Sequence, residues 1–224
     1  MVVLGGLMAT SAFGQPGGAL SSFPLLRFDA SARTAGLGGA FTAVADGDVN
    51  GFFANPALPS PATSRTSSLS YLNHLADINA GTLAYSHTAP GLGTTFSGGV
   101  RFVHWGTIQG RNRRGERTGA FSAGDVALTL GAARALGSRV RYGTNVHLLY
   151  AQIEDAQATA LATDLGVRYR VPAQQLTLGA SLRHLGTSLS GFGPKSAALP
   201  LDLQVGLSKR LAHLPLLLSL TAYD

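Results

Sequence analysis

The sequence predicts an all-β fold, a transmembrane antiparallel outer-membrane β-barrel, and its composition and its hydrophobic periodicity both support this. Of its 224 residues, 45% are hydrophobic and only 12% are charged, whereas a soluble domain carries about 25% charged residues. The apolar residues are dispersed, and no stretch approaches the roughly 18 uninterrupted apolar residues of a membrane-spanning helix. From about residue 67 onward, apolar and polar residues alternate, which is the pattern of strands with one face in lipid.

The alternation predicts nine strands. Val126, Leu128 and Leu130 share one face of such a strand, and Asp125 and Thr129 share the other. Many of the strands exceed ten residues, whereas soluble strands run about 5–6 residues and a tilted membrane strand needs about 9–11. The expected strands are 67–75, 79–88, 93–106, 122–134, 138–153, 159–171, 174–185, 200–210 and 214–224.

The connections between these strands alternate in length, as expected when longer loops face outward and short turns face the periplasm. From the third strand on they are 107–121, Leu136-Gly137, 154–158, the turn at Pro172, 186–199 and the turn at His213. Single-chain bacterial barrels use an even number of strands, so nine strands cannot close one. We therefore expect the C-terminal part of the barrel to be absent from this chain, with residues 67–224 forming the part that is present.

The N-terminal region differs in character. Residues 1–14 resemble the remnant of an export signal, because an apolar start is followed by the small-x-small site Ala12-Phe13-Gly14, although no Lys/Arg region precedes it. A flexible apolar N-terminus is the alternative. Residues 15–66 are rich in Gly, Ala, Ser and Pro without alternation, and we expect a hatch or plug there.

No catalytic constellation is evident. The six histidines lie far apart, none forms an i, i+4 pair, and the chain has no cysteine, so the sequence predicts no enzyme activity, no metal and no cofactor. The formal net charge is +6, but the basic residues are scattered singly, which argues against nucleic-acid binding.

The polar face of the strands carries charges of both signs, and we expect it to line the barrel lumen. These residues either form a structural network that fills the interior or line a path for a solute. They are Arg101, Asp125, Arg141, Asp164, Arg168, Arg183 and Asp202.

The expected loop 107–121 contains four arginines, Arg111, Arg113, Arg114 and Arg117, against the single Glu116. Outside the outer membrane the nearest anions are lipopolysaccharide phosphates, which guanidinium groups bind well. The loop is therefore a candidate contact for lipid anions, and an ordinary solvated loop is the alternative.

Residues 28–58 read FDASARTAGLGGAFTAVADGDVNGFFANPAL. This segment resembles the N-terminal segment of the FadL-like barrel superfamily, including the motif Asn55-Pro56-Ala57. The resemblance implies a small helical hatch inside the barrel. Pro56 is also consistent with the end of a short helix.

Four further segments resemble the PorV/PorQ family of type IX secretion system outer-membrane proteins, and the likeness covers roughly residues 23–224. It implies a barrel of about fourteen strands, an even number as closure requires, so that about five are absent here. The segments are YLNHLADINAGTLAYSH (71–87), GAFSAGDVALTLGAARALG (119–137), LLYAQIEDAQATALATDLGVRY (148–169) and LPLDLQVGLSKRLAHLPLLLSLTAY (199–223).

The resemblance implies an anchor in the outer membrane of a Gram-negative bacterium, within a complex that attaches secreted proteins to the cell surface. The implied partners are outer-membrane lipid and lipopolysaccharide, a PorZ-like soluble surface protein, a PorU-like sortase and a PorV-like barrel. The alternative is a FadL-like transporter of long-chain fatty acids or other hydrophobic molecules. In that case Phe41, Phe52 and Phe53 would line an apolar pocket; otherwise they pack the hatch against the wall.

Overall fold

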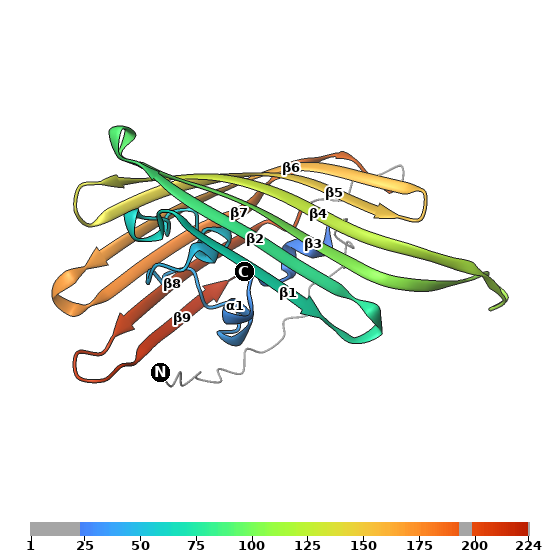
Figure 1. The fold of residues 1–224 in the computed structure, drawn as a ribbon, viewed down its shortest axis with the longest axis horizontal. Coiled ribbons are helices and arrows are strands. Elements are labelled where there is room, and N and C mark those ends of the chain that lie inside the picture. The colour runs from blue at the N-terminus through green and yellow to red at the C-terminus, as the bar shows by residue number, and fades with distance from the viewer. Residues whose placement is uncertain (1–22, 193–198, 224) are drawn as a thin grey trace.

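A computed structural model of the chain describes residues 23–192 and 199–223. These residues form one antiparallel sheet of nine strands in sequence order, with β1 and β9 at its two edges (Figure 1). The sheet is open within the described residues, and the predicted all-β fold and the nine strands are confirmed. The strands are β1 (Thr66–Asn73), β2 (Asn79–Ala89), β3 (Thr94–Arg111), β4 (Arg117–Leu136), β5 (Val140–Ile153), β6 (Ala156–Val171), β7 (Leu176–Ser190), β8 (Asp202–Arg210) and β9 (Leu217–Tyr223).

The helices are all short. Four of them precede the sheet, and the other three lie in connections between strands. None of the helices in the described ranges is long and apolar enough to cross a membrane. They are η1 (Pro24–Arg27), α1 (Ala32–Gly36), η2 (Val49–Phe53), η3 (Pro61–Thr63), η4 (Leu75–Asp77), η5 (Pro90–Leu92) and η6 (Pro172–Gln174).

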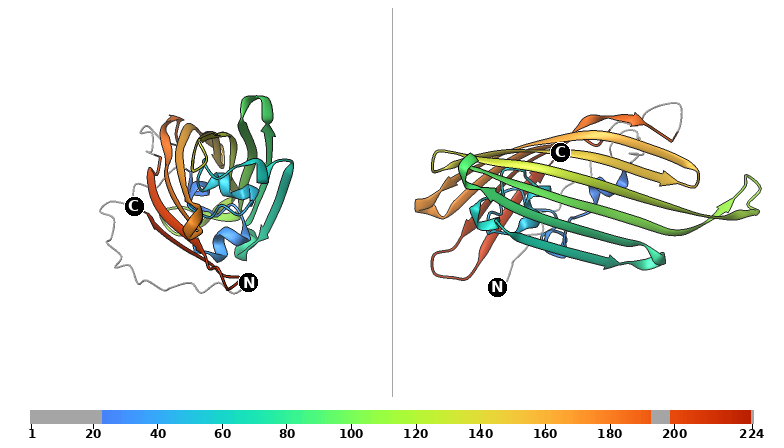
Figure 2. Two further views of the ribbon diagram at one scale, coloured as in Figure 1. Left: turned by 90° about the vertical axis from the view of Figure 1, so that its left-hand side faces the viewer. Right: turned by 45° about the horizontal axis from the view of Figure 1, so that its top comes forward.

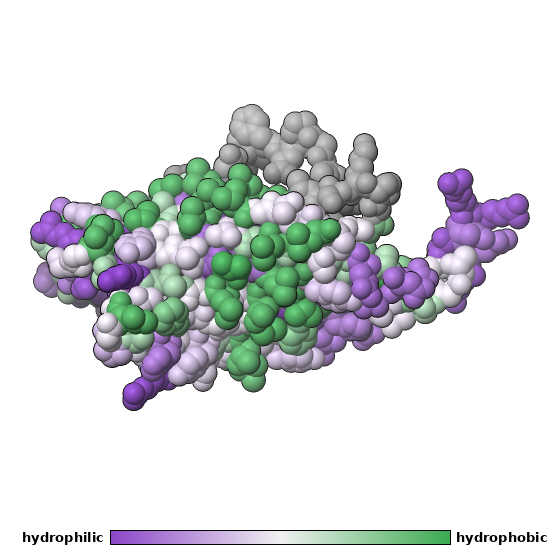
Figure 3. All heavy atoms as spheres, turned by 90° about the horizontal axis from the view of Figure 1, so that it is seen from above, coloured by the Kyte–Doolittle hydropathy of each residue, from purple (hydrophilic) through white to green (hydrophobic). Residues whose placement is uncertain are grey.

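The two faces of the sheet differ in polarity, as the alternation predicts. In β4, Leu128 and Leu130 are 42% and 61% exposed on the convex face, whereas Ala127 and Thr129 are fully buried on the concave face. Every strand contributes exposed apolar side chains, and on the face shown in Figure 3 they gather over the middle of the sheet. Such an apolar outer face matches the surface that a barrel presents to lipid.

The strands run beyond the predicted bounds at one end of the sheet. Residues 107–111 pair with residues 117–122 after a register shift at Gly106, whose φ is +71°, so the predicted loop 107–121 is a long hairpin with a tip at 112–116 (Figure 1). Ile108 and Phe121, which are register partners, are the only large apolar residues of this extension, so its alternation is too short to predict a strand.

The predicted alternation of connection lengths is also weaker than expected. β6 begins at Ala156, which shortens the predicted loop 154–158 to two residues, Glu154 and Asp155, and β7 continues to Ser190. The remainder of the predicted loop 186–199 includes residues 193–198, which lie outside the described residues, as do the predicted export signal (1–14) and residues 15–22 of the predicted hatch.

The core lies between the concave face and residues 23–65, which we call the N-terminal segment. Figure 2 shows the sheet curving around this segment. Phe23 and Leu25 pack with Val103 and Leu149 of the sheet in one cluster. Two further clusters centre on Phe52 with Ala84 and on Phe41 with Leu58.

Candidate functional site

Side-chain caps at the starts of its short helices stabilise the irregular backbone of the N-terminal segment. Ser31 accepts a hydrogen bond from the Thr34 amide (3.2 Å) at the start of α1, and Asp48 accepts one from the Asn50 amide (2.9 Å) at the start of η2. Arg33 bridges the two parts by ion pairs to Asp46 and Asp48. The hydrogen bond to Asp46 is the largest cause that raises the pKa of Arg33 above its usual value, so the guanidinium is charged at any physiological pH.

Asn55 of the predicted hatch motif is fully buried and joins the N-terminal segment to the sheet. Its Nδ2 donates to the Thr42 carbonyl (2.8 Å) and lies 3.3 Å from the carbonyl oxygen of Val167. Its Oδ1 accepts from the amide of Ala57 (2.9 Å). The side chain of Asn55 therefore forms hydrogen bonds with backbone groups of both the N-terminal segment and β6.

Glycines on the concave face allow the N-terminal segment to lie directly on the strands. A Cβ atom at Gly143 would collide with the carbonyl oxygen of Pro56, and one at Gly166 would collide with Asn55. Gly143 and Gly166 are register partners in β5 and β6. Both glycines lie within the expected strands 138–153 and 159–171, but the strand pattern does not reveal their contact with residues 55–56, which is long-range.

The predicted lumen arginines bind carbonyl groups of the N-terminal segment. Arg141 Nε donates to the Pro59 carbonyl (2.9 Å), and Arg168 Nη1 lies 3.5 Å from the Leu58 carbonyl oxygen. The irregular backbone of the N-terminal segment leaves carbonyl groups without strand partners. These carbonyl groups compete with the aspartates for the guanidinium donors.

Arg101 likewise contacts the N-terminal segment: its guanidinium lies 3.4 Å from the Phe28 carbonyl and 4.9 Å from the centre of the Phe53 ring. Of the predicted lumen set, only Arg183 and Asp202 form an Arg–Asp ion pair within the described ranges. The arginines therefore hold the N-terminal segment more than they neutralise the aspartates.

The two remaining predicted lumen residues have partners that sequence analysis did not identify. Asp125 accepts a hydrogen bond from Trp105 Nε1 (3.2 Å). Asp164 accepts from the His184 amide (2.8 Å) and contacts His147 Nε2 at 2.6 Å. Strand parity already places His147 on the same face as Asp164, but only the register of β5 and β6 shows that they meet.

Thr129, His147 and Asp164 form a continuous hydrogen-bonded chain, since Thr129 Oγ1 lies 2.9 Å from His147 Nδ1. This order of hydroxyl, imidazole and carboxylate is that of a nucleophile with its base. All three residues are at most 1% exposed, so no substrate reaches the hydroxyl. The arrangement serves to satisfy buried polar groups on the concave face.

The predicted arginine loop forms the exposed tip of the β3–β4 hairpin. Arg111 Nη1 donates to the Gly115 carbonyl (2.9 Å), and Asn112 closes the turn by accepting from the amides of Arg114 and Glu116. The hairpin extends past its neighbours (Figure 1), and its tip is hydrophilic (Figure 3). The arginines are thus presented at one end of the molecule.

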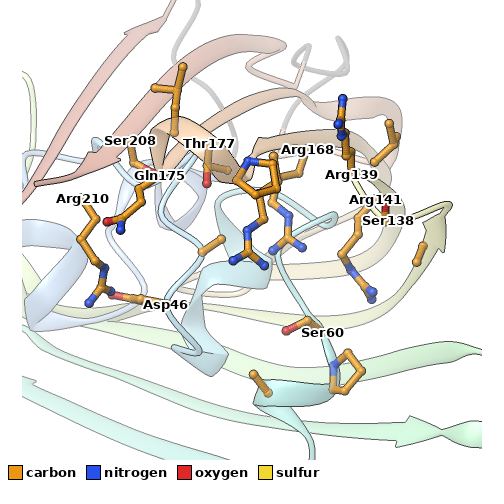
Figure 4. Close-up of a pocket in the computed structure, with 18 of the residues that line it drawn as sticks. Asp46, Ser60, Ser138, Arg139, Arg141, Arg168, Gln175, Thr177, Ser208 and Arg210 are labelled. Carbon is orange, nitrogen blue, oxygen red and sulfur yellow. The ribbon is translucent and has the colours of Figure 1, made fainter. Parts of the chain in front are cut away.

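Two cavities lie beside the N-terminal segment. One of about 750 Å³ lies at the end of the sheet where β4 turns into β5 and β6 into β7, and arginines line it (Figure 4). The other, of about 420 Å³, is lined by Asp29, Arg183 and Asp202 among others. Burial raises the pKa of Asp29 above its usual value, and the positive charges of Arg183 and Arg101 oppose this shift.

Comparison with known proteins places the chain in a family. Residues 8–173 match the uncharacterised protein family UPF0164, a range that contains the whole N-terminal segment and β1–β6. The chain belongs to this family. No curated protein matches it. The UPF0164 match includes Asn55, Arg141 and Arg168 but ends before Arg183 and Asp202.

Proposed function

We propose that this chain is an outer-membrane barrel protein of a Gram-negative bacterium, and that it anchors partners at the cell surface in a type IX secretion attachment complex. The finer assignment, to the PorV/PorQ branch of FadL-like barrels, is part of the same proposal. The observation that carries it is the packing of the N-terminal segment against the concave face. A sheet whose interior is filled in this way is suited to hold other proteins rather than to pass a solute.

The surface of the sheet supports the membrane part of the proposal. Apolar side chains of all nine strands point outward, and several strands exceed the length of about 9–11 residues that a bilayer requires. An exposed apolar surface of this extent is unfavourable in water, and the hydrocarbon of a bilayer covers such a surface when it forms a continuous belt.

The β3–β4 hairpin supports the anchoring part. Its tip carries Arg113 and Arg114, and Arg117 follows at the start of β4; all three are exposed. The tip lies beyond the apolar belt of the sheet (Figure 3). Rim charges of this kind steer partners and set the rate of association. The tip is therefore the contact site that we assign to a PorZ-like surface protein, with lipopolysaccharide phosphate as a competing ligand.

Transport of hydrophobic molecules, the alternative, has less support. Phe41 and Phe52 are fully buried and Phe53 is 5% exposed, each within a packed cluster. The larger cavity is lined by charged and polar side chains, among them Arg141, Arg168 and Asp46, whereas a site for a fatty acid is lined mostly by apolar groups.

The test is purification of the full-length protein from its native outer membrane in mild detergent, followed by mass spectrometry of whatever accompanies it. The proposal expects a PorZ-like soluble protein, a PorU-like sortase and a PorV-like barrel. A protein that arrives alone with bound fatty acid would support the transporter instead.

A matched pair of variants tests the role of the hairpin tip. Replacing Arg113, Arg114 and Arg117 by Gln removes three charges from the tip, and we expect capture of the soluble partner to fall at least fivefold. The control replaces Arg65, Arg134 and Lys209, three exposed cations elsewhere, by Gln and keeps capture unchanged. Equal capture by both variants would exclude the tip as the contact.

A further inference from the structure

The cavity of about 750 Å³ beside the β4–β5 and β6–β7 turns carries an excess of positive charge. The turns after β4 and β6 form one side of it, β7 and β8 form another, and the N-terminal segment closes it near Asp46 and Ser60 (Figure 4). We call it the basic cavity. Five arginines line it against one acidic residue, Asp46, a balance of five minus one, or +4; the arginines are Arg139, Arg141, Arg168, Arg170 and Arg210.

The single carboxylate in the lining does not balance these arginines. Asp46 is already bound to Arg33, which lies outside the cavity lining. No carboxylate in the described part of the chain forms an ion pair with Arg141 or Arg168. The positive charge of the basic cavity is therefore uncompensated by the protein.

Two of the guanidinium groups have donors without acceptors. Arg141 is only 8% exposed, and while its Nε binds the Pro59 carbonyl, its Nη2 is buried with no partner among the described residues. Arg168 binds the Leu58 carbonyl through Nη1, and its buried Nε also lacks a partner there. A buried donor without an acceptor destabilises the protein, so binding of a ligand that accepts from these donors is favoured.

Arg141 and Arg168 are direct register partners in β5 and β6. Like charges directly opposite one another in a sheet are destabilising. Figure 4 shows both side chains extending from their strands toward the part of the N-terminal segment that carries Ser60. A single doubly charged group placed between them would accept from both and offset their repulsion.

We propose that the basic cavity binds a phosphate group, held between Arg141 and Arg168, with Arg170 and Arg210 at the rim. A phosphate monoester carries about −1.5 to −2 charges at neutral pH and three acceptor oxygens, and guanidinium forks match this geometry. A volume of about 750 Å³ exceeds that of phosphate alone and lies within the usual range for small-molecule sites. The ligand is therefore a phosphate ester, either a soluble metabolite or the headgroup of a lipid.

This site is independent of the anchoring proposal, because it lies at the opposite end of the sheet from the β3–β4 tip (Figure 1). A failure of phosphate binding leaves the anchoring proposal untouched, and the reverse also holds.

The first experiment is calorimetric titration of the full-length protein, in neutral detergent, with glycerol 3-phosphate. We expect Arg168→Gln to bind at least tenfold more weakly than the unaltered chain, and Arg170→Gln to bind severalfold more weakly. Arg170 is exposed, so its replacement tests the cavity without any risk to folding. The control, Arg134→Gln, removes an exposed arginine of β4 that does not line the cavity and retains full affinity.

The second experiment distinguishes a lipid headgroup from a soluble ester. The protein is placed in nanodiscs of phosphatidylcholine alone or with phosphatidic acid added, and its unfolding temperature is measured. If the source is lipid, phosphatidic acid stabilises the unaltered chain and Arg134→Gln but not Arg168→Gln or Arg170→Gln. The proposal is overturned if neither probe binds, or if the cavity variants respond as the control does.

Discussion

Gly143 in β5 lies so close to the carbonyl group of Pro56 that no side chain fits between them. This contact brings the N-terminal segment onto the backbone of the sheet, and it makes a glycine necessary at that point of the strand. We expect Gly143→Ala to lower the free energy of unfolding by about 2 kcal/mol, since overpacking costs about 1–3 kcal/mol. Denaturant unfolding in detergent measures the change.

The matched control for that substitution is Gly98→Ala in β3. A Cβ there meets Leu130 Cδ2 at 3.6 Å, an ordinary van der Waals contact. Its stability should stay within about 0.5 kcal/mol of the unaltered chain. Equal losses in both variants would mean that glycine is needed for strand geometry in general, and not for the contact with Pro56.

Asn55→Ala removes the side chain that bonds to the N-terminal segment and to β6 at once. The carbonyl of Thr42 and the amide of Ala57 would lose their partners, and a buried unsatisfied group costs about 1–3 kcal/mol. We expect residues 40–58 to become the first site of limited proteolysis. Asn73→Ala, at the exposed end of β1, should leave the cleavage pattern unchanged; the same pattern in both variants would contradict the role of Asn55.

Asp164→Ala leaves the His184 amide and the His147 ring without their acceptor. For two such buried groups we expect a loss of about 3 kcal/mol or more in the free energy of unfolding. Asp155→Ala, at the exposed turn between β5 and β6, should change stability by less than about 0.5 kcal/mol. A small effect at Asp164 would mean that water replaces the carboxylate in this cluster.

The orientation of the barrel is testable because the chain has no cysteine. We expect Arg114→Cys, at the tip of the β3–β4 hairpin, to react with a large polyethylene-glycol maleimide in intact cells. Ser138→Cys, in the turn after β4, should react only after the outer membrane is permeabilised. The opposite result would place the hairpin tip in the periplasm and remove it as a surface contact.

The sheet was predictable because strands such as β4 keep period 2, with Val126, Leu128 and Leu130 on the outer face, the pattern expected of strands with one face in lipid. The strand ends were not, since residues 107–111 and 117–121 carry only the paired Ile108 and Phe121 as large apolar side chains. Where neither face meets lipid, alternation carries no information about pairing.

The charged residues of the concave face were predictable by position but not by partner. Parity places Arg141 and Arg168 inward, and opposite charge suggests that aspartates bind them. Their observed acceptors are the carbonyls of Pro59 and Leu58, which lie 82 and 110 residues away in sequence, in backbone without regular pairing. Such contacts depend on where the N-terminal segment crosses each strand, and composition does not encode that.

We infer that the convex face of the sheet lies in a lipid bilayer while the N-terminal segment fills the concave face. The most direct test labels Leu128→Cys, on the convex face of β4, with a water-soluble maleimide in native outer membranes. We expect no reaction until detergent removes the lipid, whereas Arg114→Cys in the same membranes should react at once. Labelling of Leu128→Cys in intact membranes at the rate of Arg114→Cys would contradict it.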